Sequence, residues 1–365
     1  MKNYFENSLF ISQRIAKQVN LRLEHNFLAI KEEVSSWGNS FNLYLTGSLS
    51  RKEPSIRVIN DEAVLNSDID LVAVVSSSCD AEEVNYIHKK LVKLLGESAV
   101  ITTRADKLPL LQSCFARDLE LSLSNPLYEC FLIKEAPLQT VQFEHYYETT
   151  IHQISCYLFH PSFNMGEKGV YIRSEHTYHT IKLVLESLKL NLFPYKKTVI
   201  LYKDLLDKTF SDSVQEILPL DTIKQFILKR EIFNPKDLQE INIGNLIERA
   251  ICPYFGIPFS ESCRLVELLE YQSTLGHGLI VTFQFIMLAL IISINKPHHE
   301  QCLYWRIILQ LIANQTESNF SSFREIILLK EDAFSHNKSC LKLLSSYRQD
   351  YYNALYSKNI GGEIN

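Results

Sequence analysis

The sequence contains no closely spaced pair of cysteines. Its eight cysteines are scattered through the chain, at positions 79, 114, 130, 156, 252, 263, 302 and 340. Zinc ribbons and thiol–disulfide motifs need two cysteines about three positions apart, so this spacing argues against both. The thiols are typical of reduced, mostly buried cysteines, and the predicted location of the protein is the cytoplasm.

An export signal and an excess of positive charge are also missing. The first residues, MKNYFENSLF, carry acids and asparagines where an export signal has a basic start and an apolar block. The 37 Lys and Arg residues are outnumbered by 42 Asp and Glu residues, whereas binding along a nucleic acid depends on positive charge. We therefore expect neither export nor a long nucleic acid as a partner.

One apolar run raises the question of a membrane segment. Residues Leu279–Ile294 carry no charge, but as a helix they would reach only about 24 Å, less than the roughly 30 Å core of a bilayer. Thr282 and Gln284 interrupt the run with polar side chains. The run therefore predicts the central helix of a helical core, and no membrane partner is expected.

The first 150 residues mix two periodicities. Apolar residues three or four apart predict helices, and short apolar or alternating runs between turn residues predict strands. The predicted helices cover residues 12–34 and 80–95, and the predicted strands are Phe41–Leu45, Ile69–Val75, Ala99–Thr103 and Leu119–Ser124. Strands interleaved with helices indicate an α/β unit.

The second part of the chain has a helical period throughout, with no glycine- and serine-rich linker, fixed repeat or low-complexity tract in the sequence. The helix-like segments include residues 176–190, 198–210, 221–230, 262–273, 304–315 and 322–334. The predicted fold class is therefore α+β, with an α/β domain in residues 1–150 and an all-helical domain in residues 151–365.

Two acids, Asp68 and Asp70, stand at the start of the predicted strand Ile69–Val75. Residues two apart on a strand point to the same face, about 6.6 Å from each other, so both carboxylates can hold one pair of divalent ions. Buried carboxylates repel each other, and a cation is their usual partner. A set of oxygen ligands favours Mg²⁺ over zinc, with Mn²⁺ as the alternative metal.

The pair Gly47-Ser48 lies directly after the predicted strand Phe41–Leu45. A glycine at such a turn lets backbone amides approach a phosphate, and the serine hydroxyl adds a donor. Arg51, one turn further along, is either a phosphate ligand or an exposed surface residue. This group of residues predicts that a triphosphate binds with its α-phosphorus toward the metal ions.

The order Gly47-Ser48, then Ser67-Asp68-Ile69-Asp70, then a later acid resembles the nucleotidyltransferase superfamily built on the DNA polymerase β palm. The resemblance covers about residues 41–125. It implies a third acid between apolar residues on a neighbouring strand. Glu120, in Leu-Glu-Leu, fits that pattern, and Asp118 is the competing candidate.

Two features depart from the family pattern. The third acid is normally Asp, so Glu120 implies either a strand set farther back or altered metal binding. The step from Ser48 to Asp68 is also longer than in compact forms of the motif. The stretch PSIRVINDEAVLN within it resembles an insertion, either a loop at the rim of the site or a surface excursion.

The resemblance implies a metal-dependent nucleotidyltransferase that moves a nucleoside monophosphate from a nucleoside triphosphate to an acceptor hydroxyl and releases pyrophosphate. Asp68, Asp70 and Glu120 would be the catalytic residues and the ligands of two Mg²⁺ ions. Gly47, Ser48 and Arg51 would contact the phosphates. From the helical part, Lys182 lies in a cluster of polar and aromatic residues and is a further phosphate ligand, or else part of an exposed helix start.

The acceptor stays open among a nucleotide, a small molecule, a protein side chain and an RNA end. Two alternatives accompany this interpretation. One is a nucleotide-binding or protein-interaction module that has lost turnover, and the other is an RNA 3′-end nucleotidyltransferase. The replacement of Asp by Glu120 and the long gap in the motif motivate the first alternative.

Overall fold

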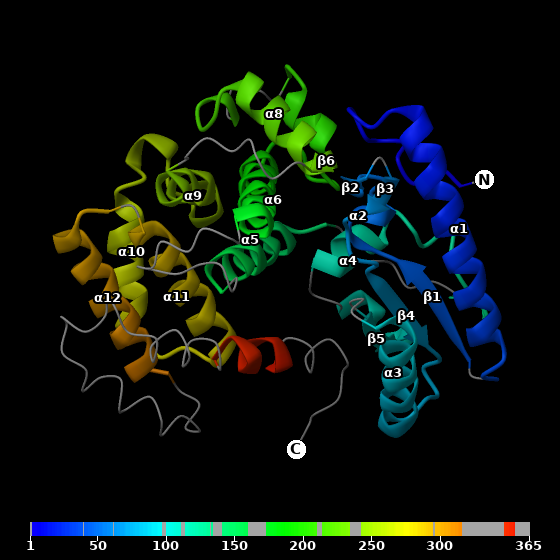
Figure 1. Cartoon of the computed structure of the whole chain (residues 1–365). Helices are drawn as coiled ribbons and strands as arrows, with labels where there is room; N and C mark the ends of the chain where they lie inside the picture. The colour runs from blue at the N-terminus through cyan, green and yellow to red at the C-terminus, as the bar shows by residue number, and fades with distance from the viewer. Residues whose placement is uncertain are drawn as a thin grey trace.

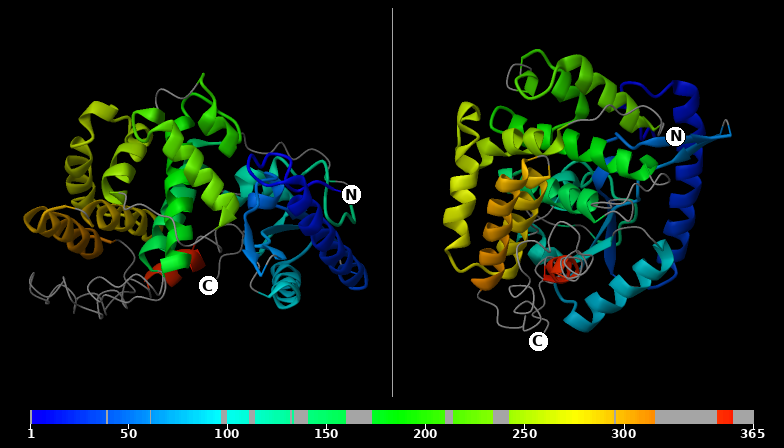
Figure 2. Two further views of the ribbon diagram at one scale, coloured as in Figure 1. Left: turned by 45° about the horizontal axis from the view of Figure 1, so that its top comes forward. Right: turned by 60° about the vertical axis from the view of Figure 1, so that its left-hand side comes forward.

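The computed structural model describes residues 2–38, 40–60, 62–96, 100–110, 114–131, 133, 141–159, 173–209, 214–233, 242–294, 296–315 and 347–354. It contains two small sheets beside a larger group of helices (Figure 1). The left view of Figure 2 shows the same separation from another direction. The α+β class predicted from the sequence is confirmed at this level.

The first sheet brings the two halves of the sequence motif together. Its strand order is β1-β4-β5, with β1 at Phe41–Leu45, β4 at Leu71–Val75 and β5 at Val100–Arg104. β1 and β4 are antiparallel, with Leu45 opposite Leu71, and β4 and β5 are parallel. The residues after β1 and the residues before β4 therefore lie at the same edge of the sheet.

Both faces of this sheet are covered. On one face, α1 (Gln13–Ser35) and α3 (Ala81–Leu95) share a hydrophobic cluster with alternate residues of β1 and β4. Asp80 begins α3 with the capping box predicted from the sequence. On the other face, η1 (Ala105–Leu110) and α4 (Cys114–Leu119) complete a second cluster.

The segment between Ser48 and Asp68 joins the two parts of the molecule. It forms a hairpin of β2 (Ile56–Ile59) and β3 (Glu62–Leu65), and β2 also pairs in parallel with β6 (Ile232–Phe233) from the helical part. The structure thus corrects the interpretation of this stretch as a rim loop or surface excursion, because its backbone hydrogen bonds connect distant parts of the chain.

The helical part has one large hydrophobic core. Its centre is α11 (Leu279–Ser293), in which nearly every side chain is buried, as predicted for this run. α5 and α6 pack against each other, α5 also packs against α11, and α6 packs against α9. The α-helix bounds are α5 Phe143–Leu158, α6 Arg173–Leu192, α8 Leu220–Glu231, α9 Ile243–Ile251, α10 Arg264–Ser273 and α12 His298–Ala313, with a further helix over residues 347–354. Short 3-10 helices are η2 Tyr202–Leu206, η3 Cys252–Phe255 and η4 Phe259–Glu261.

Within the described ranges, no helix is both long and apolar enough to cross a membrane.

The helix predicted over residues 198–210 is wrong, because only η2 forms there. The amide of Leu201 bonds to the Asp204 side chain, and the amide of Tyr202 bonds to Glu53. The helix predicted over residues 322–334 lies outside the described residues.

The division into domains at residues 150 and 151 stays a prediction. It falls inside α5, whose buried residues belong to the large core from Val141 onward.

The predicted strand Leu119–Ser124 is also wrong. Leu119 ends α4, and the chain then turns, with the amide of Ser122 bonded to the carbonyl of Leu119 at 2.9 Å. Leu119 and Ser122 are buried, whereas Glu120 and Leu121 are exposed. Burial therefore does not alternate along this stretch, although the alternating letters LELSLS imitate the period of a strand.

Candidate active site

The motif residues meet at the edge of the first sheet. The amide of Thr46 donates to the carbonyl of Asp70 at 2.9 Å, which continues the β1–β4 pairing past the strands. The chain then turns at Gly47, with φ at +64°, into the short helix α2 (Gly47–Ser50). A Cβ atom at Gly47 would collide with Oδ2 of Asp70 and would lie 2.9 Å from its Cγ. The glycine is therefore needed both for its backbone angle and for the close approach of the Asp70 carboxylate.

Gly47→Ala should destabilise the protein more than Gly38→Ala does. Both glycines have positive φ, at +64° and +69°, but an added Cβ at Gly38 meets nothing within 4 Å. Gly38→Ala thus reports backbone strain alone, about 1–2 kcal/mol, and the collision with Asp70 should add about 1–3 kcal/mol at Gly47. Urea unfolding of the two variants measures the difference. Equal losses would show that the Gly47–Asp70 contact does not constrain the site.

A pocket opens beside this turn, between the first sheet and the helices α5, α6 and α8. Its empty space of about 620 Å³ includes a part that is open to solvent. Its lining is formed by Gly47, Ser48, Arg51, Ser67, Asp68, Asp70, Arg117, Asp118, Thr149, His152, Gln153, Lys182, Glu186 and Arg230. Both parts of the chain therefore contribute to one site.

Six of the seven residues predicted for the site line this pocket. They are Gly47, Ser48, Arg51, Asp68, Asp70 and Lys182. The exception is Glu120, which is exposed in the turn after α4 and is not part of the lining. The correction follows from the helical turn at Leu119, which directs Asp118 inward instead.

Asp118 is buried, with only 1% of its surface exposed. Its Oδ1 accepts from Nε of Arg117 at 2.7 Å, its Oδ2 accepts from Nη2 of Arg117 at 2.9 Å, and Oδ2 also pairs with Arg51. The competing candidate for the third acid is therefore buried and paired with arginines. Because both oxygens contact guanidinium groups, Asp118 holds two arginines in place at the pocket wall.

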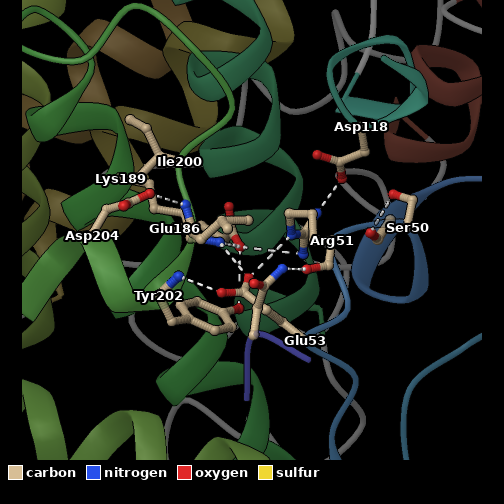
Figure 3. Close-up of polar contacts among 12 residues, drawn as sticks. Ser50, Arg51, Glu53, Asp118, Glu186, Lys189, Ile200, Tyr202 and Asp204 are labelled. Atoms are coloured by element: carbon tan, nitrogen blue, oxygen red, sulfur yellow. Dashed lines mark hydrogen bonds and ion pairs between the residues drawn. The ribbon is translucent and has the colours of Figure 1, made fainter. Parts of the chain in front are cut away.

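Arg51 is the centre of a buried network of charges (Figure 3). Besides Asp118, its guanidinium contacts Glu53 at 3.5 Å and Glu186 at 4.0 Å. Glu186 also contacts Arg117 at 3.4 Å and Lys189 at 3.3 Å. Burial raises the pKa of Glu186, but the surrounding cations outweigh it and hold that pKa well below its ordinary value. These contacts keep the carboxylate charged in a site shielded from water.

Glu53 connects this network to the helical part. Its side chain accepts from the amide of Tyr202 and lies 3.7 Å from Nζ of Lys189, as Figure 3 shows. Its carbonyl accepts from Nη1 of Arg230 at 2.6 Å. Such buried ion pairs need nearly complete pairing, because one uncompensated charge costs about 3–5 kcal/mol. The network therefore fixes the relative position of the pocket walls.

Two cations from the helical side, Lys182 and Arg230, are part of the pocket lining. Arg230 is fully buried, and its Nε and Nη2 have no hydrogen-bond partner among the described residues. Lys182 lies with Nζ 5.2 Å from the ring centre of Tyr178, and nearby Tyr178 and Asp68 raise its pKa against the lowering effect of burial. Both side chains therefore bring positive charge to the pocket lining.

The acids on the sheet side of the pocket, Asp68 and Asp70, favour binding of a cation. Burial raises the pKa of Asp70, Lys182 opposes this and Asp68 adds to it, with a net value of about 7. A cation bound beside these two acids would stabilise the ionised form of Asp70, which is only partly ionised near neutral pH. Asp68 itself is exposed at the pocket rim.

The sequence interpretation missed the contribution of α5, α8 and much of α6. Thr149, His152 and Gln153 are spaced as one face of a helix, but α5 also carries polar residues on its other faces, so its sequence does not single this face out. Likewise, Lys182, Glu186 and Lys189 follow one face of α6. Nothing in the local sequence around Arg230 distinguishes it from Lys229 beside it, which is only half-buried.

Comparison of the chain with family models, with curated proteins and with solved structures found no match.

Proposed function

We propose that the chain is a metal-dependent nucleotidyltransferase that transfers a nucleoside monophosphate to an acceptor hydroxyl. The observation that carries the proposal is the contact of the Gly47 turn with Asp70 in a pocket shared with Asp68, Lys182 and Arg230. The acids on the sheet side of the pocket face the cationic residues on its helical side. A metal–triphosphate complex has the matching arrangement of cation and anion.

The residues present fit a magnesium ion. Among the described residues, no three His, Cys, Asp or Glu side chains are grouped to hold a metal by themselves, but Mg²⁺ is commonly held through one or two carboxylates together with substrate phosphates and water. Asp68 and Asp70 would be those ligands, and Mn²⁺ could replace Mg²⁺ there. When bound, the metal would polarise the phosphate and stabilise the charge that develops on the leaving oxygen.

The phosphates would bind between the Gly47-Ser48 turn and the helical wall. Lys182 and Arg230 would contact the β- and γ-phosphates, since both are cationic residues of the pocket lining. The acceptor oxygen would then bond to the α-phosphorus as the bond to pyrophosphate breaks. Arg51 would act indirectly, because its guanidinium is already engaged by three carboxylates.

A second candidate function is a nucleotide-binding module without turnover. It is favoured by the contacts of Asp118, whose two oxygens are paired with arginines. With Glu120 exposed outside the pocket, only Asp68 and Asp70 remain as acids facing the site without an arginine partner among the described residues. Members of the nucleotidyltransferase superfamily that the motif resembles use three acids. A site with two such acids therefore favours nucleotide binding without turnover.

One experiment separates the two functions. The purified chain is incubated with each labelled nucleoside triphosphate, singly and mixed, with Mg²⁺ and cell extract, and the labelled product is identified by mass. Calorimetry with ATP and GTP, with and without Mg²⁺, measures binding in parallel. Binding together with pyrophosphate release supports transfer. Binding without pyrophosphate across all acceptors supports the module, and no binding at all contradicts both.

Ser48→Ala should weaken binding of a nucleoside triphosphate more than binding of the monophosphate, by about tenfold against about twofold. Ser48 lines the pocket at the turn where the outer phosphates would lie, and a hydrogen bond to a charged group contributes about 1.5–3 kcal/mol. Calorimetry with ATP and AMP checks the ratio. Ser50→Ala is the matched control, because Ser50 bonds to the carbonyl of Gly47 and is not part of the lining. Equal losses for both ligands would contradict the role of Ser48.

A further inference from the structure

A second cluster of reactive groups lies on α5, behind the pocket. The Sγ atom of Cys156 is 3.5 Å from Nε2 of His152 and 3.9 Å from Nη2 of Arg348. The other ring nitrogen of His152, Nδ1, lies 2.7 Å from the hydroxyl of Tyr352. Arg348 also donates from Nε to Ser155 at 2.7 Å. The cluster is thus built between α5 and the helix over residues 347–354.

This geometry differs from that of an ordinary buried cysteine. A thiol between an imidazole and a guanidinium is held as a thiolate, because both neighbours favour the negative charge. Burial raises the pKa of Cys156, but His152, Arg348 and the more distant Lys182 outweigh it and lower the pKa to about 7. Burial lowers the pKa of His152, whereas the thiolate raises it more strongly.

We propose that Cys156 is a site of oxidation by small hydroperoxides, at which His152 supplies a proton and Arg348 holds the thiolate. Cys156 is partly exposed, so a molecule the size of hydrogen peroxide is the fitting oxidant. This proposal does not depend on nucleotidyl transfer.

The step balances with the groups in the cluster. The Cys156 thiolate attacks one oxygen of hydrogen peroxide, an S–O bond forms and the O–O bond breaks. The departing hydroxide takes the proton from the His152 imidazolium and leaves as water. Sulfur loses two electrons, peroxide gains them, and the product is a sulfenic acid.

The consequence reaches the pocket because His152 is part of its lining. While Cys156 is a thiolate, its charge favours the imidazolium form of His152, and the uncharged sulfenic acid removes that effect. The contacts of the thiolate with Arg348 also change, and these help to hold the helix over residues 347–354 on α5. Oxidation of Cys156, which is not part of the pocket lining, therefore changes the charge at the pocket through His152.

Peptide-resolved mass spectrometry of the full chain tests the proposal. Alkylation by iodoacetamide is followed from pH 5.5 to 9.5, and the exposed Cys130 and Cys263 serve as internal controls. The rate at Cys156 should reach half its plateau near pH 7, whereas ordinary thiols do so near about pH 8.5. Hydrogen peroxide followed by dimedone should label Cys156 in preference to both controls.

Variants of the helix over residues 347–354 test whether Arg348 causes the low alkylation midpoint of Cys156. Arg348→Gln should move the midpoint at Cys156 upward and lower its rate at pH 6.5 several-fold. Gln349→Ala is the matched control, since its exposed side chain bonds only to Asn353 among the described residues. Circular dichroism confirms that both variants fold, and His152→Gln gives a second upward shift. A midpoint at Cys156 equal to that of the controls, or no alkylation and no dimedone adduct at any pH, would overturn the proposal.

Discussion

Asp70→Asn is expected to abolish pyrophosphate release and, at the same time, to stabilise the metal-free protein. The carboxylate is needed if it is a metal ligand, and an amide is a much weaker one, so the rate should fall by at least about a thousandfold. Without metal, the same carboxylate is partly buried next to Asp68, and its ionisation is unfavourable. Removing the charge should therefore raise the melting temperature of the metal-free protein.

The stabilisation should depend on pH in a defined direction. The folded-state pKa of Asp70, about 7, lies above its ordinary value of 3.8. A raised carboxyl pKa contributes stability below pH 4 that is lost as the pH rises toward 7. Asn does not titrate, so the advantage of Asp70→Asn over the natural chain should be small at pH 4.5 and largest near pH 8. Its size should be at most a few kcal/mol.

Melting curves at pH 4.5 and 8, with and without Mg²⁺, provide the measurement. Mg²⁺ should raise the melting temperature of the natural chain at pH 8 and have little effect on Asp70→Asn. Asp68→Asn is the matched control: Asp68 is exposed, so its replacement should lower turnover without the same gain in metal-free stability. Turnover that survives in Asp70→Asn would refute the metal assignment.

The sequence predicted the sheet end of the site well, because the signals there are local. Gly47 is needed for its backbone angle, and the apolar run after Asp70 is a buried strand. Antiparallel pairing of that strand with β1 then places the two segments together. Short-range rules of turns and strand periodicity were sufficient for this step.

The opposite wall could not be predicted in the same way. Arg230 reaches the pocket only because β6 pairs with the hairpin within the motif, more than 160 residues earlier in the chain. Glu53, a residue in the long gap of the motif, is buried by contacts with Lys189 and Tyr202. Such positions depend on tertiary pairing, which leaves no local periodic signal.

The third acid shows how a local pattern can mislead. The letters LELSLS alternate, so the period predicted a strand with Glu120 facing the metals. The chain instead turns after α4, and Asp118 becomes the buried residue. Because helix and strand periods are hard to separate in short runs, the neighbouring sequence could not decide between them.

Asp118→Asn is therefore expected to have the largest effect on stability, about 3–5 kcal/mol. The substitution leaves Arg51 and Arg117 buried with one fewer negative charge, and breaking one side of a buried pair costs that much. The amide also places a donor where both guanidinium groups need an acceptor. Guanidinium chloride unfolding should show a lower midpoint, while far-ultraviolet circular dichroism should show that helices still form in the folded state.

Glu120→Gln is the matched control for Asp118→Asn, since it lies two residues away and makes the same chemical change on an exposed side chain. We expect a stability change within about 0.5 kcal/mol and little change in nucleotide binding. Two results would reverse this assignment. If Asp118→Asn cost less than about 1 kcal/mol, the buried network around Arg51 would be wrong. If Glu120→Gln kept its stability but lost pyrophosphate release, Glu120 would be the catalytic acid, and the turn after α4 would have to move toward the pocket during turnover.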